Sequence, residues 1–370
     1  MEDVAPSRLD RGVLAVEQRL GRAGTAAAVG AVGLALACVA VAPGVVPQKL
    51  GQFYAQSYAW LSLDPFVNAS QNPVAFRPLT PLISWAVGLR GSRLLFTNLT
   101  LAALLLSCVF AWFRRRAPRP GDALLAAAVF CFSFLTLGTV FSPYYCDALT
   151  YLVIFAMACA RGRPLVFYAL FAVGLFNRES LVFVVPWFAF LELWDSLRRV
   201  RTLATQSLCY SVALAPYLFF RAWMAARAPM ALGVEDYLAP LAADPLHFFR
   251  QTARFQWAGL YSIFGPAWVL VTAGAVALWR RGERGAVLGL AVLGVSVWSQ
   301  LWLAIDTSRL LALVFPAMLV ALEALFRDGS LRVREWAPWV VLVQALAPPT
   351  QAVANLYFAM DSLVATLLWK

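Results

Sequence analysis

The stretch LLFTNLTLAALLLSCVFAWF, residues 94–113, followed at once by Arg114-Arg115-Arg116, decides the fold. The run has no charged side chain, and it is as long as the roughly 20 residues that a helix needs to cross a bilayer. Arginines directly after such a run are typical of a cytoplasmic flank, because basic residues collect in cytoplasmic loops. We therefore interpret residues 94–113 as a transmembrane helix that ends in the cytoplasm.

The composition extends this interpretation to the whole chain. Of 370 residues, 62% are hydrophobic and 13% are charged, and the mean hydropathy is +0.72. A soluble domain has roughly 45–50% apolar and about 25% charged residues. The composition excludes a cytosolic enzyme, a disordered regulator and a disulfide-stapled secreted module. The formal charge of +11 comes from short arginine clusters between apolar runs, which indicates topology signals and no nucleic-acid partner.

Applying the same two criteria along the chain predicts an all-α membrane protein of one domain with about eleven spans. Every basic cluster falls in the cytoplasm if the N-terminal tail, residues 1–23, lies there too. The first span is expected to be uncleaved, because Pro43 directly follows the small residues that resemble a cleavage site. The predicted spans are 24–42, 94–113, 123–141, 147–160, 164–176, 180–194, 203–220, 257–278, 285–304, 309–326 and 336–350.

Two long loops, 43–93 and 221–256, are predicted to be external. The apolar segment Pro78–Leu89 in the first loop is too short to span, so we expect a re-entrant or interfacial helix there. The three spans between residues 147 and 194 are also short, which suggests a cavity open to the outside. Residues 351–370 are expected to form either an outer-surface helix or a twelfth span.

Charged side chains at membrane depth are candidates for function, because each costs about 2.5–3.5 kcal/mol on insertion scales. Outside the cytoplasmic clusters and the polar parts of the loops, seven such residues map to the predicted outer face from five places in the chain. Convergence of this kind is typical of an active site. The seven are Asp64, Arg77, Asp147, Arg178, Glu179, Asp306 and Arg309.

Most of these residues also have a structural interpretation. Asp64 precedes a proline and suits a turn, and Arg77 suits an interfacial anchor. Asp147 opens a predicted helix, where the dipole favours an acid. Asp306 and Arg309 are spaced i, i+3 and suit a local ion pair.

The strongest functional signal is NRES, residues 177–180, which interrupts two short apolar runs. A tight turn between spans would more often use glycine, asparagine or proline alone. Arg178 and Glu179 are adjacent, so they point to different sides of a helix and need not pair with each other.

These features together resemble the GT-C superfamily of bacterial multi-spanning glycosyltransferases. The resemblance is carried by the uncleaved first span, the long first loop with its acidic residue, and three motifs: RPLTP at 77–81, NRES at 177–180 and DTSR at 306–309. It implies an external active site on the bacterial inner membrane. It also implies a polyprenyl-phosphate-linked sugar donor, a glycan, lipid or protein acceptor, and an acidic base in the first loop. This chain departs from better-known members because Asp64 has no paired acidic residue, so a divalent metal is not supported.

The chemistry of sugar transfer fits these residue types. A carboxylate is needed to take the proton of the acceptor hydroxyl, and we choose Asp64, with Asp147 as substitute. Arginine offers a fixed fork for the oxygens of the leaving phosphate. Tyrosines suit a sugar-stacking surface, although an interfacial aromatic belt is the alternative. The predicted substrate-binding residues are Arg77, Tyr144, Tyr145, Asn177, Arg178, Glu179, Asp306 and Arg309.

Two other functions fit the same sequence features. An O-antigen-type polymerase or ligase also acts on lipid-linked sugars at the outer face. A transporter or flippase of lipid-linked sugars would instead place its ionisable residues at the midplane and at both faces, often beside broken helices. The bias of the candidates toward the predicted outer face favours a transferase.

Overall fold

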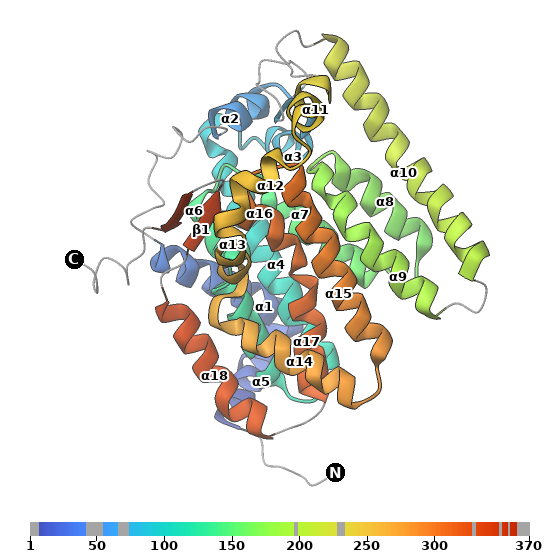
Figure 1. Ribbon diagram of the computed structural model, residues 1–370. Coiled ribbons are helices and arrows are strands. Elements are labelled where there is room, and N and C mark those ends of the chain that lie inside the picture. Colours follow the sequence, from blue (N-terminus) through green and yellow to red (C-terminus); the bar gives the residue numbers. More distant parts are fainter. Residues whose placement is uncertain are drawn as a thin grey trace.

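The computed structural model of the chain describes residues 7–41, 55–65, 74–195, 199–227, 234–327, 331–347, 350–353 and 356–360. These residues form a mostly helical bundle (Figure 1). The longer helices are α1 (Arg8–Ala40), α4 (Leu94–Arg116), α5 (Pro120–Cys131), α7 (Asp147–Cys159), α8 (Pro164–Leu175), α9 (Val185–Asp195), α10 (Arg199–Arg227), α14 (Trp268–Arg280), α15 (Arg284–Trp298), α17 (Pro316–Arg327) and α18 (Leu331–Leu346). The shorter ones are α2 (Ala55–Leu63), α3 (Leu79–Ala86), α6 (Phe134–Phe141), α11 (Val234–Ala243), α12 (His247–Thr252), α13 (Gln256–Phe264) and α16 (Thr307–Leu311). Short 3₁₀ helices include η3 (Val74–Phe76), η4 (Gly91–Arg93), η5 (Glu179–Val184), η6 (Ala253–Phe255), η7 (Gly265–Ala267), η8 (Ser299–Trp302) and η9 (Ala312–Val314).

Several of these helices are long and apolar enough to cross a membrane. Six segments qualify within the described residues, and a seventh is added if α5 and α6 count as one span bent by 45°. The lengths and composition of these helices are those of a multi-pass membrane protein. The six are Arg8–Ala40, Gly91–Arg116, Val200–Arg227, His247–Arg280, Arg284–Trp302 and Thr307–Arg327.

The prediction of eleven spans is not confirmed. The predicted spans 147–160 and 164–176 correspond to α7 and α8, which have 13 and 12 residues. At 1.5 Å per residue such helices are about 20 Å long, against a hydrocarbon core of about 30 Å. The predicted span 180–194 is divided between η5 and α9. The chain between residues 147 and 195 therefore consists of short elements.

The core is built around the segment Thr307–Arg327. Of the residues in its apolar 18-residue stretch, 89% are buried. A glycine permits a close helix contact with this segment, since a Cβ at Gly274 of α14 would lie 2.5 Å from Cα of Ala321 in α17. Aromatic rings fill the space between α17 and its other neighbours, as in the edge-to-face pair of Phe113 and Phe326 at 5.6 Å. In contrast, only 17% of the residues in the apolar 18-residue stretch of Val200–Arg227 are buried. The helix α10 accordingly lies at the outer side of the bundle (Figure 1).

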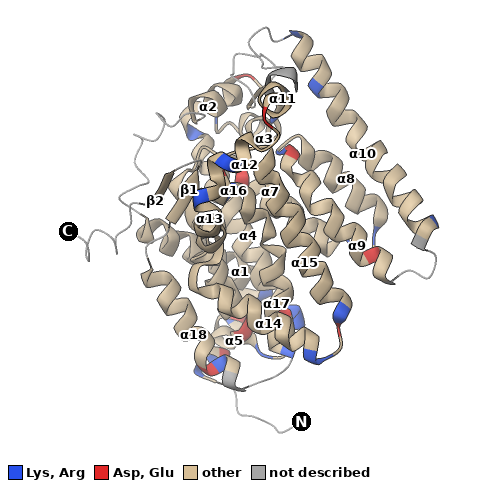
Figure 2. Ribbon diagram, in the orientation of Figure 1, with Lys and Arg blue, Asp and Glu red and all other residues tan. Residues whose placement is uncertain are grey.

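Several of the arginine clusters that the sequence assigns to the cytoplasm lie at the lower end of the bundle in Figure 2, whereas the first turn of α10, with its arginines, lies at the side. Arg114 donates to Glu17 at 2.7 Å and 3.0 Å, which joins α4 to the first half of α1. Arg334 of α18 forms an equally close bidentate pair with Asp122 of α5. These contacts join segments far apart in sequence at this end, and its cytoplasmic location stays a prediction. The short helices α2, α3 and α11 of the two long loops lie at the opposite end (Figure 1).

The chain after α18 forms a β-hairpin, where a helix was expected. Strand β1 (Thr350–Val353) pairs antiparallel with β2 (Leu356–Ala359), and Val353 lies opposite Leu356. Pro348 and Pro349 precede β1 in sequence and lack the N–H groups that would continue a helix. The prediction of a helix or a twelfth span beginning at residue 351 is therefore wrong for the hairpin, and residues 361–370 lie outside the described part.

The division of charge between the two ends leads to a topology prediction. A reporter fused after Arg116 should be cytoplasmic, and one fused near Asp244, between α11 and α12, should be external, because basic loops are retained inside. Protease and alkaline phosphatase reporters in intact cells measure this directly. The opposite location at either site would contradict the predicted orientation.

Candidate functional site

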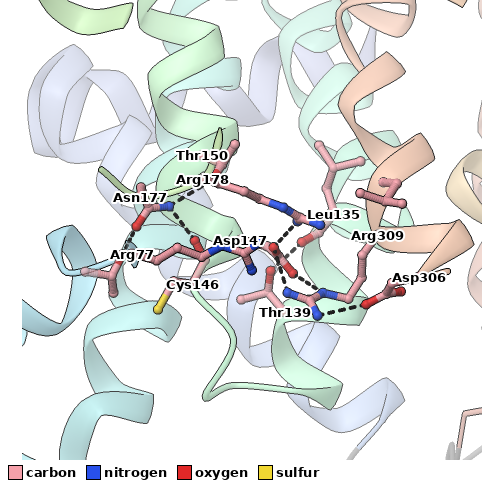
Figure 3. A network of polar contacts seen from close by, with 12 residues as sticks. Arg77, Leu135, Thr139, Cys146, Asp147, Thr150, Asn177, Arg178, Asp306 and Arg309 are labelled. Atoms are coloured by element: carbon pink, nitrogen blue, oxygen red, sulfur yellow. Dashed lines mark hydrogen bonds and ion pairs between the residues drawn. The ribbon is translucent and has the colours of Figure 1, made fainter. Parts of the chain in front are cut away.

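A buried carboxylate at the start of α7 lies between two arginines (Figure 3). The Asp147 carboxylate accepts hydrogen bonds from Arg309 Nε at 2.5 Å and Arg309 Nη2 at 3.0 Å, and it also accepts one from Arg178 Nη1. The exposed fractions of these three side chains are only 5–10%. Removing Asp147 would leave the buried Arg178 without its carboxylate partner, so the carboxylate is the member on which both arginines converge.

Asp306 completes the charge balance of this network. Its Oδ2 accepts from Arg309 Nη1 at 2.8 Å, which confirms the local i, i+3 pair expected from the sequence. Two carboxylates then face two guanidinium groups, and the four formal charges cancel. The Arg309 guanidinium also lies 3.8 Å from the centre of the Tyr145 ring, a cation–π contact that holds its plane.

A second ion pair joins the first long loop to the NRES segment. Arg77 donates to Glu179 through Nε at 2.9 Å and through Nη2 at 2.5 Å, and its Nη1 lies 3.4 Å from the Tyr58 hydroxyl of α2. Burial raises the pKa of the Glu179 carboxyl, but the charge and hydrogen bonds of Arg77 lower it more, so its pKa is about 2. Burial also raises the pKa of Tyr58 to about 12. At neutral pH Glu179 is thus ionised, and Tyr58 is a neutral hydroxyl that accepts from Arg77.

Arg178 and Glu179 point in different directions, as their adjacency predicted. Arg178 turns into the bundle toward Asp147, whereas Glu179 pairs with Arg77 at the side of the first loop. The non-helical backbone of Arg178, with φ −160° and ψ 118°, separates α8 from η5 and allows the two side chains to diverge.

Asn177, directly before Arg178, joins α3 to the start of α7 through its amide (Figure 3). Its Nδ2 donates to the Cys146 carbonyl at 2.6 Å and to Thr150 at 2.8 Å, and its Oδ1 accepts from Thr80 at 2.6 Å. The residue is 1% exposed. The sequence predicted a substrate ligand here, but the amide is engaged by three residues from α3 and the start of α7, so its position suits the docking of α3 onto α7.

A cavity of about 240 Å³ lies beside the second ion pair. Arg77 and Glu179 line it together with Arg221, near the end of α10, and the buried Gln300 of η8. The Arg221 guanidinium stacks on the Phe76 ring at 4.6 Å. The remaining lining residues are Ser180, Phe183, Leu241, Leu303, Ala304 and Leu310.

The sequence interpretation missed two of these lining residues. Arg221 was assigned to the polar start of the second loop, because the predicted span ended at residue 220, whereas α10 continues to Arg227. Gln300 is uncharged, so the search for charged side chains at membrane depth did not select it. Its Nε2 donates to the carbonyls of Val297 and Leu310, while its Oε1 accepts no hydrogen bond within the described part of the chain. That oxygen is buried, on a residue that lines the cavity.

The other predicted residues lie elsewhere at this end. Asp64 follows α2 with an exposed side chain, and α2 contacts Arg77 through Tyr58. Tyr144 is 2% exposed, so it packs inside the protein, whereas Tyr145 is half-buried under Arg309. Among the residues that the structure describes, no three His, Cys, Asp or Glu side chains gather closely enough to hold a metal ion.

Comparison with known proteins identifies no relative of this chain. No protein-family model matches the sequence, and neither a curated protein nor a solved structure matches the chain.

The two carboxylates of the first network should differ in their contribution to stability. Asp147→Asn leaves two buried arginines without their shared partner, a loss of about 3–5 kcal/mol by comparison with other buried pairs. Asp306→Asn should cost about 1 kcal/mol or less, because its side chain is 24% exposed and it serves one arginine. Thermal unfolding in detergent should therefore show a large loss for Asp147→Asn only. An Asp147→Asn protein as stable as wild type but inactive would instead support Asp147 as the catalytic base.

Proposed function

We propose that the chain is a membrane glycosyltransferase of GT-C-like architecture, which moves a sugar from a polyprenyl-phosphate-linked donor to an acceptor at the external face of the bacterial inner membrane. The donor would bind at the cavity beside Arg77 and Glu179. The observation that carries this proposal is the combination of charged and apolar groups in that cavity.

The lining charges suit a phosphodiester. Two arginines and one glutamate leave a formal charge of +1, which matches the single negative charge of a lipid-linked sugar phosphate. Glu179 already neutralises Arg77, so Arg221 is the cation left to meet the phosphate. Gln300 lines the same cavity, and its buried Oε1, which has no partner in the described part of the chain, would accept from a sugar hydroxyl once the amide turns toward the cavity.

The surroundings of the cavity suit a long apolar tail. Arg221 belongs to α10, whose side chains Leu208, Val212, Leu218 and Phe219 are exposed at 52–76%. In a bilayer these residues face lipid, so a polyprenyl chain can lie along α10 while its phosphate reaches Arg221. A soluble nucleotide-sugar would gain nothing from such a surface.

The acceptor must lose a proton as its oxygen attacks the anomeric carbon and the phosphate leaves. Glu179 and Asp147 are poor bases, because arginines stabilise their ionised forms. Asp64 stays our choice, since its carboxylate is exposed at the end of α2, and α2 contacts the cavity residue Arg77 through Tyr58.

A pair of variants on α10 tests the phosphate site. Arg221→Gln should lower transfer from a polyprenyl-phosphate sugar by roughly 10- to 100-fold, because a hydrogen bond to a charged group contributes about 1.5–3 kcal/mol. Arg227→Gln is the matched control: Arg227 is exposed and stacks on Trp223 at 4.3 Å, and its loss should change transfer less than twofold. Radiolabelled donors supplied to membranes measure both. Equal effects of the two variants would contradict the site, and transport of the intact lipid without transfer would support a flippase.

The base is tested separately by Asp64→Asn. The amide preserves shape and removes the proton acceptor, so transfer should fall by about 100- to 10,000-fold while donor binding is kept. Donor binding measured on the same preparation is the control. A fall of less than about tenfold would remove Asp64 from the reaction.

A further inference from the structure

A second, larger cavity lies against α1, and α1 is bent where it lines this cavity. Gly21 has φ 69° and ψ 171°, a conformation that glycine adopts without steric cost, and it divides α1 into residues 8–20 and 22–40. The first part is anchored to the bundle: its Asp10 accepts from the Gly121 backbone N–H at 2.8 Å, and its Glu17 pairs with Arg114. The first part of α1 is therefore held against α4 and the start of α5.

The first part of α1 has the character of an interfacial helix. Its apolar side chains Leu9, Leu14, Val16 and Leu20 are 38–54% exposed, although it lies at the charged end of the protein. The same segment and its flank carry Arg8, Arg11, Arg19 and Arg22. Exposed leucines beside arginines are typical of helices that lie at the boundary between headgroups and acyl chains.

The cavity on the inner side of this bend has a volume of about 360 Å³. Both parts of α1 line it together with α4 and α5, and almost every lining group is apolar, for example Val16, Val32, Leu106 and Ala128. Arg8 is the one charged residue among the lining residues, and it lies at the first end of α1. The cavity thus combines a hydrocarbon-like interior with a cation at one end.

We propose that this cavity binds an acyl chain of an anionic phospholipid, with the lipid phosphate held by Arg8. Neither acidic side chain of the same segment lines the cavity: Asp10 accepts from Ser7 and from the Gly121 N–H, and Glu17 pairs with Arg114. The site is at the end opposite to the Arg77–Glu179 cavity, so it is independent of the proposed transferase reaction. The bound lipid would fasten the first part of α1 to the membrane surface.

The test compares phosphatidylglycerol and phosphatidylcholine with identical acyl chains, titrated into the purified full chain and followed by native mass spectrometry. The wild type should bind phosphatidylglycerol about fivefold more tightly, and Arg8→Gln should remove that preference, since one arginine near a membrane surface contributes about this factor. Gly12→Phe should weaken both lipids at least fivefold, because Gly12 lines the cavity and a Cβ there meets no atom within 4 Å. Gly294→Phe is the matched control, since Gly294 also has open space and lies on α15; it should leave both affinities within twofold.

Three results would each overturn the proposal. The first is equal binding of the two lipids by the wild type, and the second is an unchanged preference in Arg8→Gln. The third is unchanged phosphatidylglycerol binding in Gly12→Phe. If Gly12→Phe does not fold, Ala28→Leu replaces it, because Ala28 lines the cavity from the second part of α1. This variant should also weaken the binding of both lipids.

Discussion

The shared carboxylate of Asp147 is the interaction on which the rest of the site depends. It holds Arg178 and Arg309, which come from segments 31 and 162 residues away in the chain. With Arg178 fixed inward, the following Glu179 faces the first loop, where it pairs with Arg77. The carboxylate therefore sets the positions of groups that it does not itself contact. A buried network of this kind does not by itself stabilise a fold, since the cost of desolvation offsets the attraction, but it specifies one arrangement of its members.

The short elements around this network explain how polar groups reach so far into an apolar bundle. α7 and α8 have 13 and 12 residues, and η5 follows them without completing a span. Their ends carry Asp147 and the 177–180 segment, which meet α3 below the surface of the first loop. Backbone groups at these ends are satisfied by side chains, as Asn177 does for the Cys146 carbonyl. Polar and irregular structure is thus enclosed by protein rather than exposed to lipid.

The sequence was sufficient for the class of fold and for most of the charged residues at this end. Long uncharged runs and arginine clusters are strong signals, because the cost of placing charge in lipid acts on each residue separately. Pairing is different: nothing in the order of residues says that Arg77 meets Glu179 across 102 positions, or that Asp147 is shared by two arginines. Arg221 was missed because the apolar run ends at residue 220, although α10 continues to Arg227. Gln300 was missed because an uncharged amide does not stand out among the residues of an apolar span. The hairpin after α18 was missed because a short apolar segment fits a helix as well as a strand.

The central claim is that the cavity between Arg77, Arg221 and Gln300 receives a lipid-linked sugar phosphate. The most direct measurement is a cryo-electron microscopy structure of the protein in nanodiscs with a non-transferable polyprenyl-phosphate sugar. Our account predicts the phosphate within hydrogen-bond distance of Arg221, the sugar against Gln300, and the prenyl chain along α10. A donor bound at another place, with this cavity empty at saturating concentration, would contradict it.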